Sequence, residues 1–145
     1  MEIISHETVI YRLRSTTRSG VIRELLSKLK GYGHIKTIKD AYVAIMQREH
    51  ESSTYVGKGI AIPHAKGYFA NRVFCALGIS GKGVNFGGEC AYIVVLMVSS
   101  PEQTRDYIKY LTLFAKIFSR NDVIHGVKYA NNTKDIVNII NNTKV

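Results

Sequence analysis

The spacing of apolar side chains predicts two amphipathic helices in the first third of the chain. Within residues 21–29, apolar positions recur at steps of three and four, which places them on one face of a helix. Gly31 and Gly33 follow at once and indicate its end. Residues 39–49 show the same period and predict a second helix.

Three apolar segments in the middle of the chain predict strands: residues 59–62, 73–79 and 91–98. The last is an unbroken run rich in β-branched side chains, which is typical of a strand covered on both faces. Residues 7–13 alternate loosely and are expected to add an edge strand. The glycine-rich segment 80–88 is expected to be a loop, and its spacing is not that of a phosphate-binding loop.

The last third of the chain predicts three helices. Residues 100–118 open with Ser-Pro-Glu-Gln, which offers a capping hydroxyl, a proline at the first helical position and a glutamine that completes a capping box. Shorter helices are expected over residues 122–130 and 133–142. Helices, then strands, then helices predict an α/β fold: a single layered domain over residues 1–145, with a mixed central β-sheet flanked by helices.

Composition places the chain among ordinary globular proteins. With 145 residues and 46% hydrophobic content it can bury a core without disulfides. Cys75 and Cys90 lie in apolar segments and are expected to be buried free thiols in a reducing compartment. No apolar run reaches the roughly 20 residues that cross a bilayer, and residues 1–5 lack a signal-peptide pattern. We therefore expect a cytoplasmic location without membrane insertion.

The net charge of +9 suggests an acidic partner, but its distribution is not that of a nucleic-acid or membrane anchor. Lysine and arginine are scattered and never form a block of five or six. A solvated basic surface explains this pattern better, and we expect no nucleic-acid partner. A nucleic-acid-binding module is supported only by the charge.

The most informative segment is Gly-Lys-Gly-Ile-Ala-Ile-Pro-His-Ala at residues 57–65. The ring of Pro63 fixes its own φ and biases Ile62 toward extended geometry, so His64 leaves the short strand in a defined direction. A histidine after a strand is, by itself, more often structural than catalytic. The neighbouring residues therefore decide its interpretation.

Together with Arg-Glu-His-Glu-Ser-Ser-Thr at residues 48–54, this segment closely resembles the active-site region of enzyme IIA domains of the bacterial sugar phosphotransferase system. The resemblance is to the mannitol/fructose type, including its nitrogen-regulatory branch, and the order of predicted elements agrees over nearly the whole chain. It implies a phosphohistidine carrier. His64 would accept a phosphoryl group from phosphorylated HPr and pass it to a IIB domain, or hold it as a regulatory signal, without a cofactor.

The chemistry of these side chains agrees with that role. An imidazole with an ordinary pKa of about 6.5 is largely neutral in the cytoplasm and can attack phosphorus. By the resemblance, Arg48 would supply positive charge through a fork of donors that matches phosphate oxygens. Without the motif, Arg48 would be interpreted as a surface residue at a helix end. Thr54 and His50, from the same segment, are further candidates for the phosphoryl site.

The sequence departs from the family at one important position. These domains usually carry a second active-site histidine early in the helix after the central strand, and aligning residues 111–115 with that helix puts Tyr107 at its place. A tyrosine can donate to a phosphoryl oxygen but cannot become cationic near neutral pH. Tyr107 could equally be a packing residue. The alternative function is therefore a regulatory binding module with impaired phosphotransfer.

A carrier also needs a surface that partners recognise. Ile60, Ile62 and Phe86 are expected to form an apolar rim around the histidine, although Phe86 could instead fill the edge of the core. Candidates for a positive rim are Lys58, Lys66, Arg105 and Lys109. The histidines and cysteines show no metal-ligand spacing, so no metal is expected. The sequence leaves a homodimer open.

Overall fold

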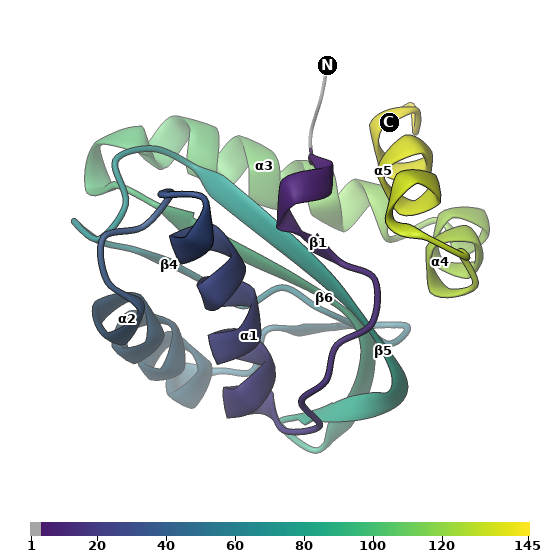
Figure 1. Ribbon diagram of the computed structural model, residues 1–145, viewed down its shortest axis with the longest axis horizontal. Coiled ribbons are helices and arrows are strands. Elements are labelled where there is room, and N and C mark those ends of the chain that lie inside the picture. Colours follow the sequence, from purple (N-terminus) through teal and green to yellow (C-terminus); the bar gives the residue numbers. More distant parts are fainter. Residues whose placement is uncertain (1–3) are drawn as a thin grey trace.

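A computed structural model describes residues 4–145, which form one mixed sheet of six strands with helices on both faces (Figure 1). The strands are β1 (Val9–Ile10), β2 (Tyr55–Gly57), β3 (Ile60–Ala61), β4 (His64–Lys66), β5 (Phe74–Phe86) and β6 (Glu89–Ser99). Their order is β1-β5-β6-β3-β2, and β4 also pairs with β6. β5 and β6 are antiparallel, whereas β1 runs parallel to β5 and both β3 and β4 run parallel to β6. The expected α/β class with a mixed sheet is confirmed.

The helices cover the sheet in two layers. They are α1 (Arg18–Gly31), α2 (Ile38–Glu51), α3 (Thr104–Ile117), α4 (Asn121–Lys128) and α5 (Thr133–Asn141), with short 3-10 turns η1 (His6–Thr8) and η2 (Pro101–Gln103). On β6, Val94 and Leu96 belong to the core shared with α1 and α2, whereas Val95 and Met97 belong to the core shared with α3, α4 and α5. This alternation explains why β6 is apolar at every position over residues 93–98. Over residues 4–145, no helix combines the length and the apolar character needed to span a membrane.

The ends of the elements differ from the expectations where local hydrogen bonds decide them. α1 starts earlier than its apolar stripe because the Thr17 hydroxyl accepts from the backbone N–H of Gly20 at 3.1 Å. The expected capping box at the start of α3 is wrong. Ser100 makes no capping bond, because the chain first forms η2 and α3 starts only at Thr104. Similarly, η1 occupies part of the expected strand 7–13, which shrinks to β1.

The segment 80–88 is not the expected loop but the distal half of β5 and its turn into β6. β5 continues to Phe86 through a shift of register between Ile79 and Val84. Gly87 and Gly88 both have positive φ (65° and 97°) and suffice for the reversal. Val84 and Phe86 are fully buried on the face covered by α1 and α2, so their burial holds this glycine-rich segment in the sheet.

The cysteines also differ from expectation. Cys75 is half-buried on β5, but Cys90 is exposed beside the hairpin turn, so the expectation of two buried thiols is wrong for Cys90. Cys90 is the second residue of β6 and pairs with Asn85 next to the hairpin turn.

We expect these two thiols to react at different rates. Burial raises the pKa of Cys75 to about 12, so almost none of it is thiolate at neutral pH. Titration with dithionitrobenzoate should show one fast and one slow thiol, with rates that differ by more than about tenfold. Cys90→Ser should remove the fast phase, and loss of the slow phase instead would contradict the described burial.

Candidate functional site

β3 and β4 position His64 at an open edge of the sheet. The two strands follow one another along β6, and between them the backbone N–H of Met97 donates to the carbonyl of Pro63 at 2.9 Å. The backbone on both sides of His64 is therefore held by the same long strand. His64 does not leave a strand, as the sequence suggested, but begins the next one after the interruption at Pro63.

One ring nitrogen of His64 is fixed by the backbone two residues earlier. Nδ1 lies 2.7 Å from the carbonyl oxygen of Ile62. A carbonyl can only accept, so Nδ1 carries the hydrogen, and in the neutral ring Nε2 holds the lone pair. The local chain geometry therefore leaves Nε2 as the ring nitrogen with an available lone pair.

The surroundings of His64 also favour the neutral ring. Burial lowers its pKa below the ordinary value of 6.5, and the positive charge of Arg48 lowers it further. The hydrogen bond to Ile62 and the negative charge of Glu49 act in the opposite direction without reversing the result. At neutral pH the ring is therefore predominantly uncharged.

We expect His64 to titrate below 6.5 when its ring protons are followed by NMR. Because the folded protein takes up this proton less readily than the unfolded chain does, acidification below the ordinary pKa should also remove stability. Phosphorylation should be fastest on the alkaline side of this transition. A midpoint above 6.5 would contradict the described burial.

Arg48 and His64 line the same open cavity, of about 420 Å³, between α2, β4 and α3. The lining residues of α2 recur at helical steps of three and four: Ala44, Gln47, Arg48 and Glu51. Arg48 Nη1 donates to the carbonyl of Ser52 at 2.8 Å, which ties the guanidinium to the end of its helix. The cavity therefore combines a neutral imidazole with a positively charged fork of donors.

Tyr107 forms part of the α3 wall of this cavity. Its ring centroid lies 5.8 Å from that of His64 in an edge-on arrangement, and 7% of the residue is exposed. Burial raises the pKa of the phenol, so it remains protonated and uncharged. Tyr107 thus packs in the core below α3 and also contacts the histidine, and its role toward a phosphoryl group stays a prediction.

A known protein family matches nearly the whole chain. The family model of the phosphoenolpyruvate-dependent sugar phosphotransferase system, EIIA 2, matches residues 2–143. The chain belongs to the EIIA 2 family.

Relatives of this EIIA 2 chain include both multidomain and separate proteins. The chain is 27% identical over 143 residues to the fructose-specific EIIABC component of Bacillus subtilis, a match that covers 97% of this chain and 22% of that protein. It is also 27% identical over 146 residues to the mannitol-specific phosphotransferase enzyme IIA component of Geobacillus stearothermophilus, covering 97% of both. The chain thus spans about a fifth of the first relative and nearly all of the second.

Solved structures share the fold. The nitrogen regulatory protein IIA-Ntr from Neisseria meningitidis superposes with a TM-score of 0.87 at 18% identity, over 96% of this chain and 97% of that one. The complex of enzyme IIAMTL and phosphorylated enzyme IIBMTL from Escherichia coli gives a TM-score of 0.81 at 18% identity, over 94% and 96% of the two chains. Similarity at this level of identity establishes the common architecture.

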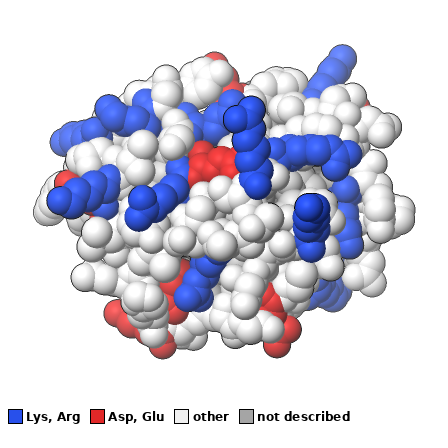
Figure 2. All heavy atoms as spheres, turned by 60° about the horizontal axis from the view of Figure 1, so that its bottom comes forward, with Lys and Arg blue, Asp and Glu red and all other residues white. Residues whose placement is uncertain are grey.

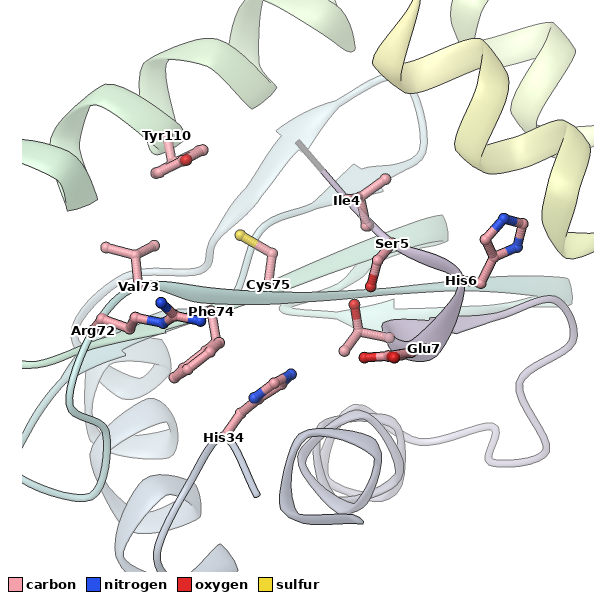
Figure 3. Close-up of a pocket in the computed structure, with 11 residues that line it drawn as sticks. Ile4, Ser5, His6, Glu7, His34, Arg72, Val73, Phe74, Cys75 and Tyr110 are labelled. Carbon is pink, nitrogen blue, oxygen red and sulfur yellow. The ribbon is translucent and has the colours of Figure 1, made fainter. Parts of the chain in front are cut away.

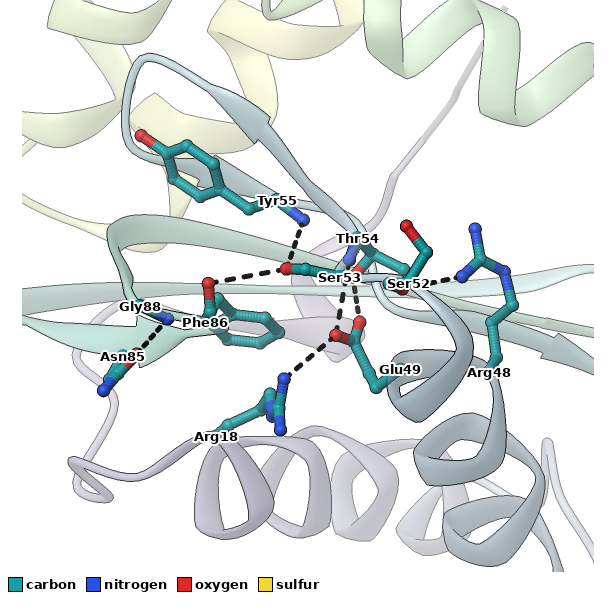
Figure 4. A network of polar contacts seen from close by, with 10 residues as sticks. All are labelled: Arg18, Arg48, Glu49, Ser52, Ser53, Thr54, Tyr55, Asn85, Phe86 and Gly88. Atoms are coloured by element: carbon teal, nitrogen blue, oxygen red, sulfur yellow. Dashed lines mark hydrogen bonds and ion pairs between the residues drawn. The ribbon is translucent and has the colours of Figure 1, made fainter.

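Thr54, a candidate for the phosphoryl site, is instead engaged by a buried carboxylate of this EIIA 2 chain (Figure 4). Its hydroxyl and its backbone N–H both donate to Glu49, the N–H at 3.3 Å. Arg18 approaches the same carboxylate at 3.5 Å, and the Glu49 side chain has no exposed surface. The Thr54 hydroxyl is therefore not free to donate to a phosphoryl group, and this assignment is corrected.

Sequence reasoning did not identify this network, although a signal was present. Glu49 continues the buried stripe of α2 at steps of four from Ala41 and Ile45. A carboxylate at a core position requires a cation or several donors, because an isolated buried charge is very unfavourable. The partner Arg18 lies on α1 and could not be identified from the spacing of the motif.

His50, the other candidate for the phosphoryl site, and the residues expected to form the apolar rim also need correction. His50 is exposed and does not line the cavity, because two residues along a helix turn a side chain about 200° away from Arg48. Ile60, Ile62 and Phe86 are 0–3% exposed, so the apolar rim expected from them is wrong. Ile60 and Ile62 pack in the core with α3, α4 and α5. Phe86 packs on the other face of the sheet, in the core with α1 and α2.

Of the basic residues expected around His64, only Lys66 lines the cavity. Lys58 donates to the carbonyl of Ser119 at 2.9 Å and to Asn121 at 3.1 Å, so it joins the β2–β3 turn to the junction of α3 and α4. Arg105 and Lys109 are exposed on α3 outside the cavity lining. Figure 2 shows Lys and Arg dispersed over one face around a small acidic patch, rather than gathered in one block.

A second groove, of about 510 Å³, lies where residues 4–8 approach the start of β5 (Figure 3). Two of its basic groups pack on Phe74: the His34 ring stacks at 4.1 Å, and the Arg72 guanidinium lies 5.1 Å from the ring centroid. None of the residues proposed for phosphoryl chemistry lines it. Within residues 4–145, no group of three or more His, Cys, Asp or Glu side chains is arranged to hold a metal ion.

Proposed function

We propose that this chain is a phosphohistidine carrier in which Nε2 of His64 receives a phosphoryl group and passes it on. Membership of the EIIA 2 family supports this class of function. The observation that carries the assignment is the 2.7 Å contact between Nδ1 and the carbonyl of Ile62, beside the cavity that also contains Arg48. It leaves one defined nitrogen with a lone pair next to a fork of positively charged donors.

In the proposed transfer, the lone pair of Nε2 attacks the phosphorus of a donor phosphohistidine. The new N–P bond forms as the donor's N–P bond breaks, and that bonding pair remains on the donor imidazole. The His64 ring then carries a positive charge and a dianionic phosphoryl group. The Ile62 carbonyl stabilises the charged ring through its remaining N–H, and Arg48 offsets the charge on the phosphoryl oxygens.

The partners follow from this chemistry. The donor is proposed to be a phosphorylated HPr-type carrier, and the acceptor a IIB domain or a regulatory target. A solved relative of the same fold is a complex of enzyme IIAMTL with phosphorylated enzyme IIBMTL, which supports a IIB-type acceptor for this chain. The chain is proposed to act as a single domain, because both helical layers pack on one sheet.

Incubation of the chain with phosphorylated HPr-type carrier tests the proposal. Intact-mass analysis should detect one added phosphoryl group that is stable in alkali and labile in acid. His64→Gln should abolish the adduct, whereas His50→Gln, a matched change at an exposed histidine, should leave it unchanged. An unmodified wild type with several donors would reject the carrier function. Gain of transfer by Tyr107→His in that case would favour the regulatory binding module.

A further inference from the structure

Lys66 lines the same cavity as His64. The two residues are two positions apart on β4, so their side chains project from the same face of the strand, about 6.6 Å apart along it. Lys66 Nζ is 3.2 Å from the hydroxyl oxygen of Thr104 and 5.6 Å from the centroid of the Tyr107 ring. The ammonium group is therefore held on the α3 wall of the cavity.

The contacts that hold this ammonium group are weak and exchangeable. The Thr104 hydroxyl already donates to the carbonyl of Pro101 at 2.9 Å and offers Lys66 only an uncharged lone pair. The Tyr107 ring adds a neutral aromatic face. Between residues 4 and 145 the ion pairs are Arg18 with Glu49 and Arg120 with Asp122, so no described carboxylate forms an ion pair with Lys66, although Glu51 lines the same cavity. A phosphoryl oxygen carrying negative charge is a much stronger partner for an ammonium group than either neutral contact.

The position of Lys66 complements that of Arg48. The guanidinium comes from α2, whereas Lys66 meets Thr104 and Tyr107 of α3 across the same cavity. A phosphoryl group in transfer spreads its charge over three oxygens, and one fork of donors from one side leaves part of that charge without a partner. Tyr107 cannot supply a second positive charge, since a phenol side chain has no cationic form near neutral pH.

We propose that Lys66 is a second phosphate-binding cation of this site. Its ammonium group gives up its contacts with Thr104 and Tyr107 and binds the phosphoryl group on His64. This inference rests on the proposed carrier function and adds a catalytic residue to it. It also accounts for how the site keeps two cations around the phosphoryl group although a tyrosine stands at position 107.

The test compares Lys66→Met with Lys66→Arg and with Lys109→Met, a matched change at an exposed lysine outside the cavity. Single-turnover phosphorylation of His64 is measured with two donors: phosphorylated HPr-type carrier, and phosphoramidate, a small donor that makes no protein interface. Lys66→Met should slow the reaction about tenfold with both donors. Lys66→Arg should restore most of the rate, and Lys109→Met should have no effect. Thermal unfolding should be unchanged in all three variants.

The outcomes separate the two proposals. If wild type gains no phosphoryl group from either donor, the carrier function itself fails. If wild type is phosphorylated and Lys66→Met reacts at the same rate, the carrier function stands and the role of Lys66 is overturned. An effect confined to the protein donor would also overturn it, because Lys66 would then act in docking rather than on phosphate.

Discussion

Replacing Arg48 by methionine is expected to slow phosphoryl transfer to His64 by about 10²–10³-fold, the cost of removing a preorganised charged donor from a transfer site. The guanidinium lines the cavity of His64, and after burial its positive charge is a further cause of the lowered pKa of the histidine. The change should alter stability by only about 1 kcal/mol, through loss of the bond to the Ser52 carbonyl. Rapid-quench phosphorylation together with thermal unfolding measures both effects.

Two controls make this expectation specific. Arg48→Lys keeps the charge but not the fork of donors, so its rate should fall between those of wild type and Arg48→Met. Arg105→Met removes an exposed arginine outside the cavity and should change nothing. Arg48→Met should also raise the His64 pKa measured by NMR, because a nearby positive charge is lost. An unchanged transfer rate and an unchanged pKa would place Arg48 outside the site.

Replacing Glu49 by alanine is expected to be the most destabilising single change near the site, at about 3 kcal/mol. The variant leaves Arg18 without its partner and the Thr54 N–H and hydroxyl without their acceptor in a buried setting. Because the Arg18 side chain is 25% exposed, water can hydrate part of the freed charge, which keeps the cost at the lower end for a broken buried pair. The free energy of unfolding, from denaturant titration, measures the loss.

The matched control is Glu51→Ala, two residues further along the helix at an exposed position. It should change the free energy of unfolding by no more than about 0.5 kcal/mol. The Thr54 carbonyl accepts from the N–H of Ile62 at 3.0 Å, so Glu49→Ala should also loosen the segment that precedes His64. Hydrogen exchange at Ile62 should become faster in Glu49→Ala and not in the control. Equal stability of the two variants would contradict the described network.

The helices and the central strand could be predicted because their signals are local. The stripe of α1 and the unbroken apolar run of β6 each follow from the period of one element and its burial. The β5 extension could not be predicted, because glycines that usually indicate a loop are held in the sheet by the burial of Val84 and Phe86 on a distant core. Local composition and tertiary packing conflicted there, and packing decided the result.

The site residues also include some that a local motif predicts and others that depend on distant contacts. His64 and Arg48 could be assigned together from one contiguous motif, whose strand and helix meet in a single cavity. Lys58 lies equally near in sequence, but its side chain binds residues more than sixty positions away, which no local pattern indicates. The partner of Glu49 was missed for the same reason. The contact of Lys66 with Thr104, 38 residues away, likewise depends on the fold, whereas Thr54 contacts Glu49 only five residues away.

In the proposed carrier function, Nε2 of His64 is the nitrogen that carries the phosphoryl group. Phosphorylated protein with ¹⁵N-labelled histidine, examined by NMR, gives this directly from the coupling of phosphorus to each ring nitrogen. The expected result is a single phosphohistidine at position 64 substituted at Nε2, with Nδ1 still protonated and bonded to the Ile62 carbonyl. Phosphorylation at Nδ1 of His64, or at another residue, would contradict the account.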